Sequence, residues 1–262
     1  MFLACIRKNA FKALSICALG LGLVLWLVTF IAHSDETPAL TEAPISAPIL
    51  VPAPGSPPVI SLEEGKQYHR VSIAVSKDPR VQAFIAQDPG KIQLIEFFSY
   101  GCYGCQQLHP VIDQWTKDKE DLHHQPPIVL YRIPLVFHTA WEPLAKAYYT
   151  AKILNVSEQL DSDFFTAVNQ NHVDFSKENV LEDFVKVRGI DPTTFMDTYR
   201  SFGVNRQLAH NSEISLAYQI TLSPFFVVNT PAGSFVTSAV MAGSPAELVN
   251  VLNYLVALKL PP

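Results

Sequence analysis

Apolar positions along the chain change from one unbroken run near the start to shorter, periodic segments further on. Residues 13–32 include no charged side chain. A helix of that length rises about 30 Å, the thickness of a bilayer core. Arg7, Lys8 and Lys12 precede the run and acidic residues follow it, which predicts that the N-terminus stays in the cytoplasm. We expect a retained membrane anchor; the alternative is a signal peptide that is cleaved near Ser34.

The next segment is rich in proline. Seven prolines fall between Pro38 and Pro58, separated mostly by small residues. Such a stretch has too few backbone donors and large apolar groups to pack, so we expect a polyproline-II spacer of roughly 3 Å per residue. The predicted organisation is therefore a signal or transmembrane segment (1–34), a linker (35–60) and a folded domain (61–262).

Within the folded domain, strand and helix signals alternate, which predicts an α/β class. Asp78-Pro79 and Asp191-Pro192 are typical helix starts, and Ser244 opens a capping box. A long helical block, about 138–218, separates the third predicted strand from a C-terminal hairpin. The predicted strands cover residues 67–75, 93–98, 128–133, 224–229 and 233–237. The predicted helices cover residues 79–87, 143–153, 157–169, 176–187, 192 onward, 205–218 and 245 onward, together with one that follows Gly101.

Composition and charge narrow the possible partners. The chain is 48% hydrophobic, which excludes wholesale disorder. Its formal net charge is −5, so we expect no nucleic-acid partner.

Only two of the four cysteines lie in the folded domain. Cys102 and Cys105 stand three positions apart, directly after the apolar strand 93–98 and at the start of a helix. Unpaired backbone N–H groups and the helix dipole stabilise a thiolate at a helix N-terminus. Such a thiolate is a ready nucleophile and leaving group, and Cys105 is placed to attack a mixed disulfide on Cys102.

The stretch from Glu96 to Cys105, Glu-Phe-Phe-Ser-Tyr-Gly-Cys-Tyr-Gly-Cys, resembles the active-site strand and helix of the DsbA-like thiol–disulfide oxidoreductases. Glu64 to Tyr68 is similar to that family's first strand, and Ser223 to Asn229 is similar to its cis-proline strand. The resemblance implies a thioredoxin fold with an inserted helical domain over about residues 61–258.

The resemblance also assigns roles. Cys102 and Cys105 would form the redox-active disulfide, so no dissociable cofactor and no metal is expected. Pro224 would follow a cis peptide bond, and Ser223 would pair through its carbonyl with an extended substrate. Glu96 would be a buried acid that manages protons; the alternative from the residue pattern is a solvent-facing position at a sheet edge.

The dipeptide between the cysteines departs from the strong oxidases of this family. Those enzymes usually carry histidine before the second cysteine, whereas this chain has Tyr103 and Gly104. We expect both residues to touch the substrate and the disulfide to be less oxidising. His109 could join the cysteines in a zinc site with His123 or His124, but we expect His109 on a helix surface or in a groove.

These features predict a periplasmic, membrane-tethered enzyme that exchanges disulfides with exported proteins carrying free thiols or wrong disulfides. Introduction of disulfides is the favoured direction, in which case the resemblance implies a quinone-linked membrane partner. Isomerisation or reduction by the same fold is the first alternative. A thioredoxin-fold binding or chaperone module, with the cysteines as a local staple, is the second.

Overall fold

The computed structural model describes residues 62–123 and 126–258, all within the unit formed by residues 58–262. The expected spanning segment over 13–32 and the linker over 35–60 lie outside the described residues. In the described part, no helix is both long and apolar enough to cross a bilayer.

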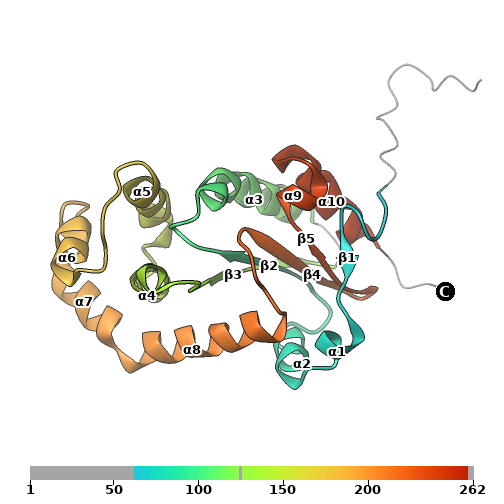
Figure 1. Ribbon diagram of the computed structural model, residues 1–262, viewed down its shortest axis with the longest axis horizontal. Helices are drawn as coiled ribbons and strands as arrows, with labels where there is room; N and C mark the ends of the chain where they lie inside the picture. The colour runs from blue at the N-terminus through green and yellow to red at the C-terminus, as the bar shows by residue number, and fades with distance from the viewer. Residues whose placement is uncertain (1–61, 124–125, 259–262) are drawn as a thin grey trace, which may run out of the picture. The chain divides into compact units, whose positions relative to one another are not determined.

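Five strands form a mixed sheet in the order β1-β5-β4-β2-β3 (Figure 1). The strand β2 (Ile92–Phe98) pairs in parallel with β3 and antiparallel with β4. Every residue of β2 is buried, as expected for a strand inside a sheet that is covered on both faces. The remaining strands are β1 (His69–Arg70), β3 (Ile128–Pro134), β4 (Phe225–Thr230) and β5 (Gly233–Thr237). The parallel pair confirms the predicted βαβ unit, whose helix is α3 (Tyr103–Asp121).

Helices cover both faces of this sheet because alternate side chains of β2 point to opposite sides. Leu94 packs in a cluster with α3 and α10 (Pro245–Ala257). Ile95 and Phe97 pack on the other face. Figure 1 shows α3 and α10 above the sheet and α1, α2 and α8 below it. The bounds of these lower helices are Ile73–Ser76 (α1), Pro79–Ile85 (α2) and Phe202–Ala217 (α8).

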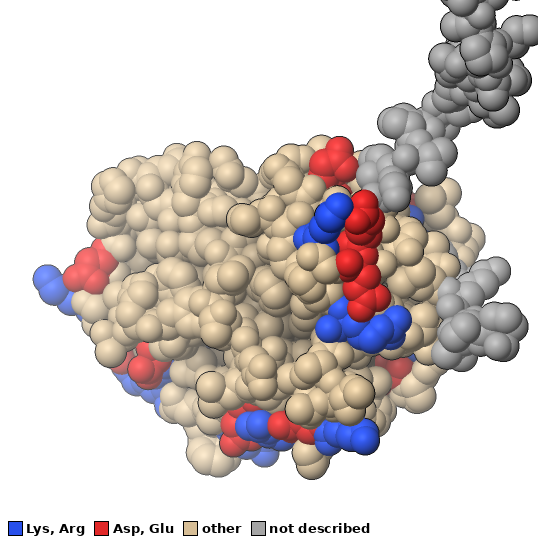
Figure 2. Space-filling model, turned by 45° about the vertical axis from the view of Figure 1, so that its right-hand side comes forward, with Lys and Arg blue, Asp and Glu red and all other residues tan. Residues whose placement is uncertain are grey.

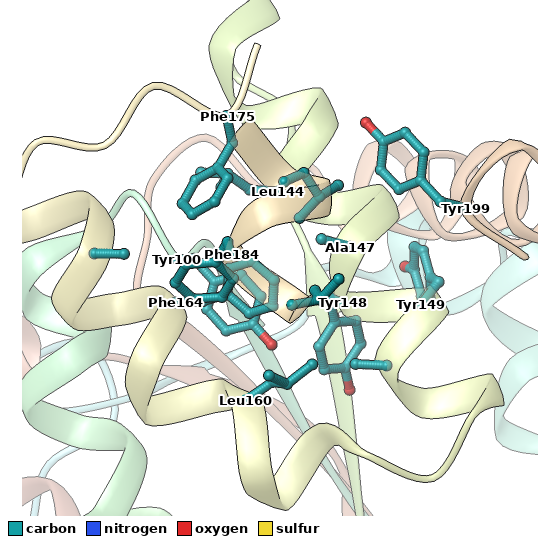
Figure 3. Close-up of a cluster of buried hydrophobic side chains, with 14 of the residues drawn as sticks. Tyr100, Leu144, Ala147, Tyr148, Tyr149, Leu160, Phe164, Phe175, Phe184 and Tyr199 are labelled. Carbon is teal, nitrogen blue, oxygen red and sulfur yellow. The ribbon is translucent and has the colours of Figure 1, made fainter. Parts of the chain in front are cut away.

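A helical block lies between β3 and β4 in the chain, as predicted. Its large aromatic cluster is drawn in Figure 3, where the ring of Phe164 stacks on Tyr100 and also packs against Phe175 and Phe184. Phe98 is the last residue of β2, and Tyr100 lies in the loop after it. The block therefore packs against the carboxyl end of that strand. Besides α8, the block comprises a 3-10 turn (Thr139–Trp141), α4 (Glu142–Ile153), α5 (Ser157–Asn169), α6 (Glu178–Lys186) and α7 (Pro192–Arg200).

Two local predictions are wrong. The strand expected over 67–75 shrinks to β1, because Ser72 caps a helix there: its Oγ accepts the Val75 N–H at 3.3 Å. The helix expected from Asn205 begins at Phe202, because the Ser201 hydroxyl caps it. A short helix, α9 (Ala239–Ala242), was not predicted.

Charged side chains are sparse on the face that Figure 2 shows. Basic and acidic side chains lie next to one another in small mixed groups, and broad uncharged surface separates these groups. Among the described residues drawn on this face, no extended patch of one charge is seen.

Candidate active site

The two cysteines lie where β2 ends and α3 begins. Cys102 is the N-cap of α3, and its Sγ accepts the Cys105 N–H at 3.3 Å. Cys102 is half-buried, whereas Cys105 is fully buried, and both are free thiols. The predicted placement at a helix N-terminus is thus confirmed.

The two thiols differ strongly in acidity. A hydrogen bond from the Cys105 thiol is the largest cause that lowers the pKa of Cys102, to about 6. Burial opposes this shift, while the Ser223 hydroxyl and the backbone amides of Cys105 and Gly104 add to it. Burial, together with the neighbouring Cys102 sulfur, raises the pKa of Cys105 far above that of an ordinary thiol. Near neutral pH, Cys102 is therefore the thiolate and Cys105 keeps its proton.

The segment before β4 faces the cysteines. The peptide bond between Ser223 and Pro224 is cis, as predicted. Ser223 Oγ lies 3.0 Å from Cys105 Sγ. A Cβ atom at Gly104 would lie 3.2 Å from Cδ of Pro224, so glycine permits this close approach. Tyr103, in contrast, is 61% exposed beside Cys102.

Glu96 is fully buried, so the alternative of a solvent-facing edge position is wrong. It stands in register with Arg132 of β3, and its Oε2 accepts the Arg132 Nε–H at 2.7 Å. Its Oε1 is buried without a hydrogen-bond partner among the described residues. Burial alone would lower the pKa of Arg132, but the carboxylates of Glu96 and Asp113 outweigh burial and raise it. Glu96 thus makes its polar contact with Arg132 rather than with either cysteine.

His109 is buried, and the expectation that it lies on a surface or in a groove is wrong. Its Nε2 lies 3.5 Å from carboxylate oxygens of both Asp113 and Asp161. Asp161 in turn accepts a hydrogen bond from the Tyr100 hydroxyl, and Asp113 lies 2.8 Å from Nη2 of Arg132. A line of charged and polar groups therefore runs from Glu96 beneath α3 to the loop before Cys102.

Trp141, for which the sequence favours a structural role over a groove-lining one, is a neighbour of the site. A Cβ atom at Gly101 would lie 2.4 Å from the indole Nε1, so Trp141 lies directly against the backbone before Cys102. The ring of Phe137 is 5.8 Å from Trp141, and that of His138 is 4.7 Å away. No local pattern identifies this contact, because only the fold brings Trp141 to Gly101.

A zinc site is not formed by the residues that the structure describes. Among them, no three Cys, His, Asp or Glu side chains are grouped as metal ligands would be. His124, one member of the zinc set considered from the sequence, lies outside the described residues.

Comparisons with known proteins agree with this geometry. No family model matches the chain. The thiol:disulfide interchange protein DsbA of Pseudomonas aeruginosa is 28% identical over 193 residues, which cover 73% of this chain and 83% of that protein. Its crystal structure superposes with a TM-score of 0.63 at 27% identity, covering 74% of this chain and 93% of that one.

A second relative places the chain in a family. The thiol:disulfide interchange protein DsbA of Bordetella pertussis is 30% identical over 169 residues, covering 64% of this chain and 77% of that protein. The oxidoreductase NmDsbA1 of Neisseria meningitidis shares the fold, with a TM-score of 0.61 at 18% identity. With its Cys-x-x-Cys helix, its cis-proline strand and this similarity, the chain belongs to the DsbA family of thiol–disulfide oxidoreductases.

Proposed function

We propose that the chain introduces disulfides into exported proteins in the bacterial periplasm. The observation that carries the proposal is the placement of the two thiols: Cys102 is the N-cap of α3, and Cys105 is fully buried one turn into the helix. Hydrogen bonds from the Cys105 thiol and N–H lower the pKa of Cys102 to about 6, whereas burial raises that of Cys105. A stabilised Cys102 thiolate favours the reduced form of the enzyme. A disulfide whose reduced form is stabilised is a better oxidant.

The reaction needs no group beyond the two cysteines. A substrate thiolate attacks Sγ of Cys102 in the oxidised enzyme; the Cys102–Cys105 bond breaks, and Cys105 leaves and takes up a proton. A second substrate thiolate then attacks the substrate sulfur of the mixed disulfide, and Cys102 leaves as a thiolate. Two substrate thiols become one disulfide, and the two electrons reside on the enzyme's dithiol.

Three further residues have proposed roles around this exchange. The Ser223 carbonyl pairs with an extended substrate segment, as a strand-edge group does, while Pro224 packs against the start of α3 at Gly104. Glu96, the buried acid of β2, accepts or supplies the proton that Cys105 exchanges.

Exposed apolar side chains near Cys102 favour unfolded or partly folded substrates. Tyr103 adjoins Cys102, and Leu222, next to Ser223, is 46% exposed. Phe137, which packs on Trp141, is 43% exposed. A substrate with apolar residues around its cysteine would bury these side chains on binding.

The first test is the reduction potential of the full chain, measured by equilibration with glutathione. The pKa of Cys102 lies between that of thioredoxin, about 7, and that of DsbA, about 3.5. We therefore expect a potential between about −270 mV and about −120 mV. A potential at or below the thioredoxin value would contradict the oxidase and favour a reductase or isomerase. That alternative is favoured by Gly104, which stands where the strong oxidases usually carry histidine.

A second test separates an enzyme from a binding module. In the reverse of this exchange, the Cys102 thiolate attacks a substrate disulfide and Cys105 then displaces the substrate. The Cys105→Ala variant cannot take this second step, so substrates should remain attached to Cys102 as mixed disulfides. Cys102→Ala is the matched control and should trap none. If Cys105→Ala also traps none, the enzymatic proposal fails.

The location of the enzyme is part of the proposal. Residues 13–32 would anchor it in the inner membrane, the linker over 35–60 would hold the catalytic domain (61–262) away from the bilayer, and a quinone-linked membrane partner would reoxidise it. Alkaline extraction of membranes should leave the full-length chain in the pellet. Recovery of a soluble chain that begins near Ser34 would instead show a cleaved signal peptide.

A further inference from the structure

A cavity of about 590 Å³ lies away from the cysteines, between the edge strand β3, the later part of α4 and residues 203–211 of α8. Its volume is within the range of small-molecule sites, about 300–1,000 Å³. Neither the cysteines nor the Ser223–Pro224 segment takes part in its wall. The wall consists of Leu130, Tyr131, Arg132, Tyr148, Tyr149, Lys152, Ile153, Gly203, Gln207 and Asn211.

The aromatic part of this wall is held in place before any ligand arrives. Tyr148 and Tyr149 are adjacent on α4, and both are almost fully buried (Figure 3). The Asn211 amide donates a hydrogen bond to the Tyr149 hydroxyl at 2.7 Å, which ties α8 to α4. The two tyrosine rings lie 5.4 Å apart in an edge-to-face arrangement. A ligand ring that reaches these tyrosines can meet them in the edge-to-face or offset-stacked geometry that aromatic pairs prefer.

The wall contains two cationic side chains, Arg132 and Lys152, and no carboxylate. Arg132 is already neutralised by Glu96 and Asp113 through Nε and Nη2. Lys152 forms no ion pair within the described part of the chain, so its charge is available to a ligand.

We propose that this cavity binds a small aromatic carboxylate. The ring lies against Tyr148 and Tyr149, and the carboxylate pairs with Lys152. The cysteines do not line the cavity, although Arg132 belongs both to its wall and to the buried pair with Glu96. Binding of the ligand does not require either direction of electron transfer.

The test uses the full-length chain and 4-fluorophenylacetate as probe, with binding followed by fluorine NMR relaxation of the probe. The uncharged 4-fluorophenylacetamide is the matched ligand. We expect the carboxylate to bind about three- to fivefold more tightly than the amide, the worth of one exposed ion pair. Equal binding of the two probes would overturn the proposal.

Two variants locate the site. A Cβ atom at Gly203 would meet only Ser201 Oγ, at 3.7 Å, so the backbone there accepts a side chain, and Gly203→Leu adds one at the cavity wall. We expect this variant to weaken binding by at least about tenfold, as overpacking does. Lys152→Gln should remove the preference for the carboxylate over the amide, while Lys186→Gln, an exposed lysine on α6, should keep it.

Cooperative unfolding in urea is the control that each variant is folded. If Gly203→Leu does not fold, Lys152→Gln still decides the question. Unchanged binding in Gly203→Leu, or an unchanged preference in Lys152→Gln, would place the probe elsewhere and refute the site.

Discussion

At the scale of single residues, the Cys102 thiol should titrate close to pH 6 in the reduced enzyme. Its hydrogen bonds, above all the one from the Cys105 thiol, lower its pKa to about 6. The rate of alkylation by iodoacetamide should therefore reach half its plateau near pH 6, and Cys105→Ala should move this midpoint upward. A midpoint above pH 8 in the unaltered enzyme would contradict the observed geometry.

The same shift makes the stability of the reduced fold depend on pH. The pKa of Cys102 is lower in the folded chain than its ordinary value of 9.0, so the unfolded chain binds more protons between these values. The contribution of the Cys102 thiolate to the free energy of unfolding is fully present above about pH 9 and is lost as the pH falls towards 6. The melting temperature of the reduced form, relative to the oxidised form, should rise over this window.

Ser223 offers a sharper test, because one hydroxyl can be removed without a change of backbone. Its Oγ lies 3.0 Å from Cys105 Sγ and helps to lower the pKa of Cys102. Ser223→Ala should raise that pKa and make the reduction potential more negative. Ser212→Ala, whose hydroxyl bonds only within α8, is the control and should change neither value. An unchanged alkylation profile in Ser223→Ala would remove this serine from the site.

At the scale of elements, the Glu96–Arg132 pair joins β2 to β3 in the interior. Arg132→Met leaves the Glu96 charge buried without its partner, which should lower the free energy of unfolding by about 3–5 kcal/mol. The double variant Glu96→Gln, Arg132→Met removes both charges and should recover most of this loss. Urea unfolding of the two variants checks the difference, and equal losses would show that the pair is not coupled.

The elements also show which features the sequence makes predictable. The helices after Asp78 and Asp191 begin where expected, because a cap is a contact within four residues. The strand predicted over residues 67–75 is wrong because Val71, Ile73 and Val75 alternate with other residues as they would in a strand. In the structure, Ile73 lies on a short helix and is 72% exposed.

Contacts between distant segments have no such local pattern. His109 is buried because Asp161 and Phe165 of α5 pack over α3. The contacts of Arg132 with Glu96 and of Trp141 with Gly101 likewise exist only once the chain has folded. The cysteines themselves were predictable because strand, turn and helix start follow one another directly in the sequence.

At the scale of the whole described unit, one core joins the helical block to the sheet. The cluster that contains Phe164 also contains Phe98, Tyr100 and Cys105. Phe164 is fully buried, and its ring stacks on Tyr100 at 5.0 Å. The block can therefore not separate from the active site without exposing the buried cysteine to solvent.

This continuity predicts a single unfolding transition. In urea, loss of helical circular dichroism and alkylation of Cys105 should follow the same curve in the reduced enzyme. Phe164→Ala should shift both curves together, with a loss of about 3–5 kcal/mol, because it opens a cavity that both parts share. Phe202→Ala is the matched control: this ring is 78% exposed on α8, so the change should stay within about 0.5 kcal/mol. Loss of helix before Cys105 reacts would show instead that the block unfolds by itself, leaving the redox centre on an intact sheet.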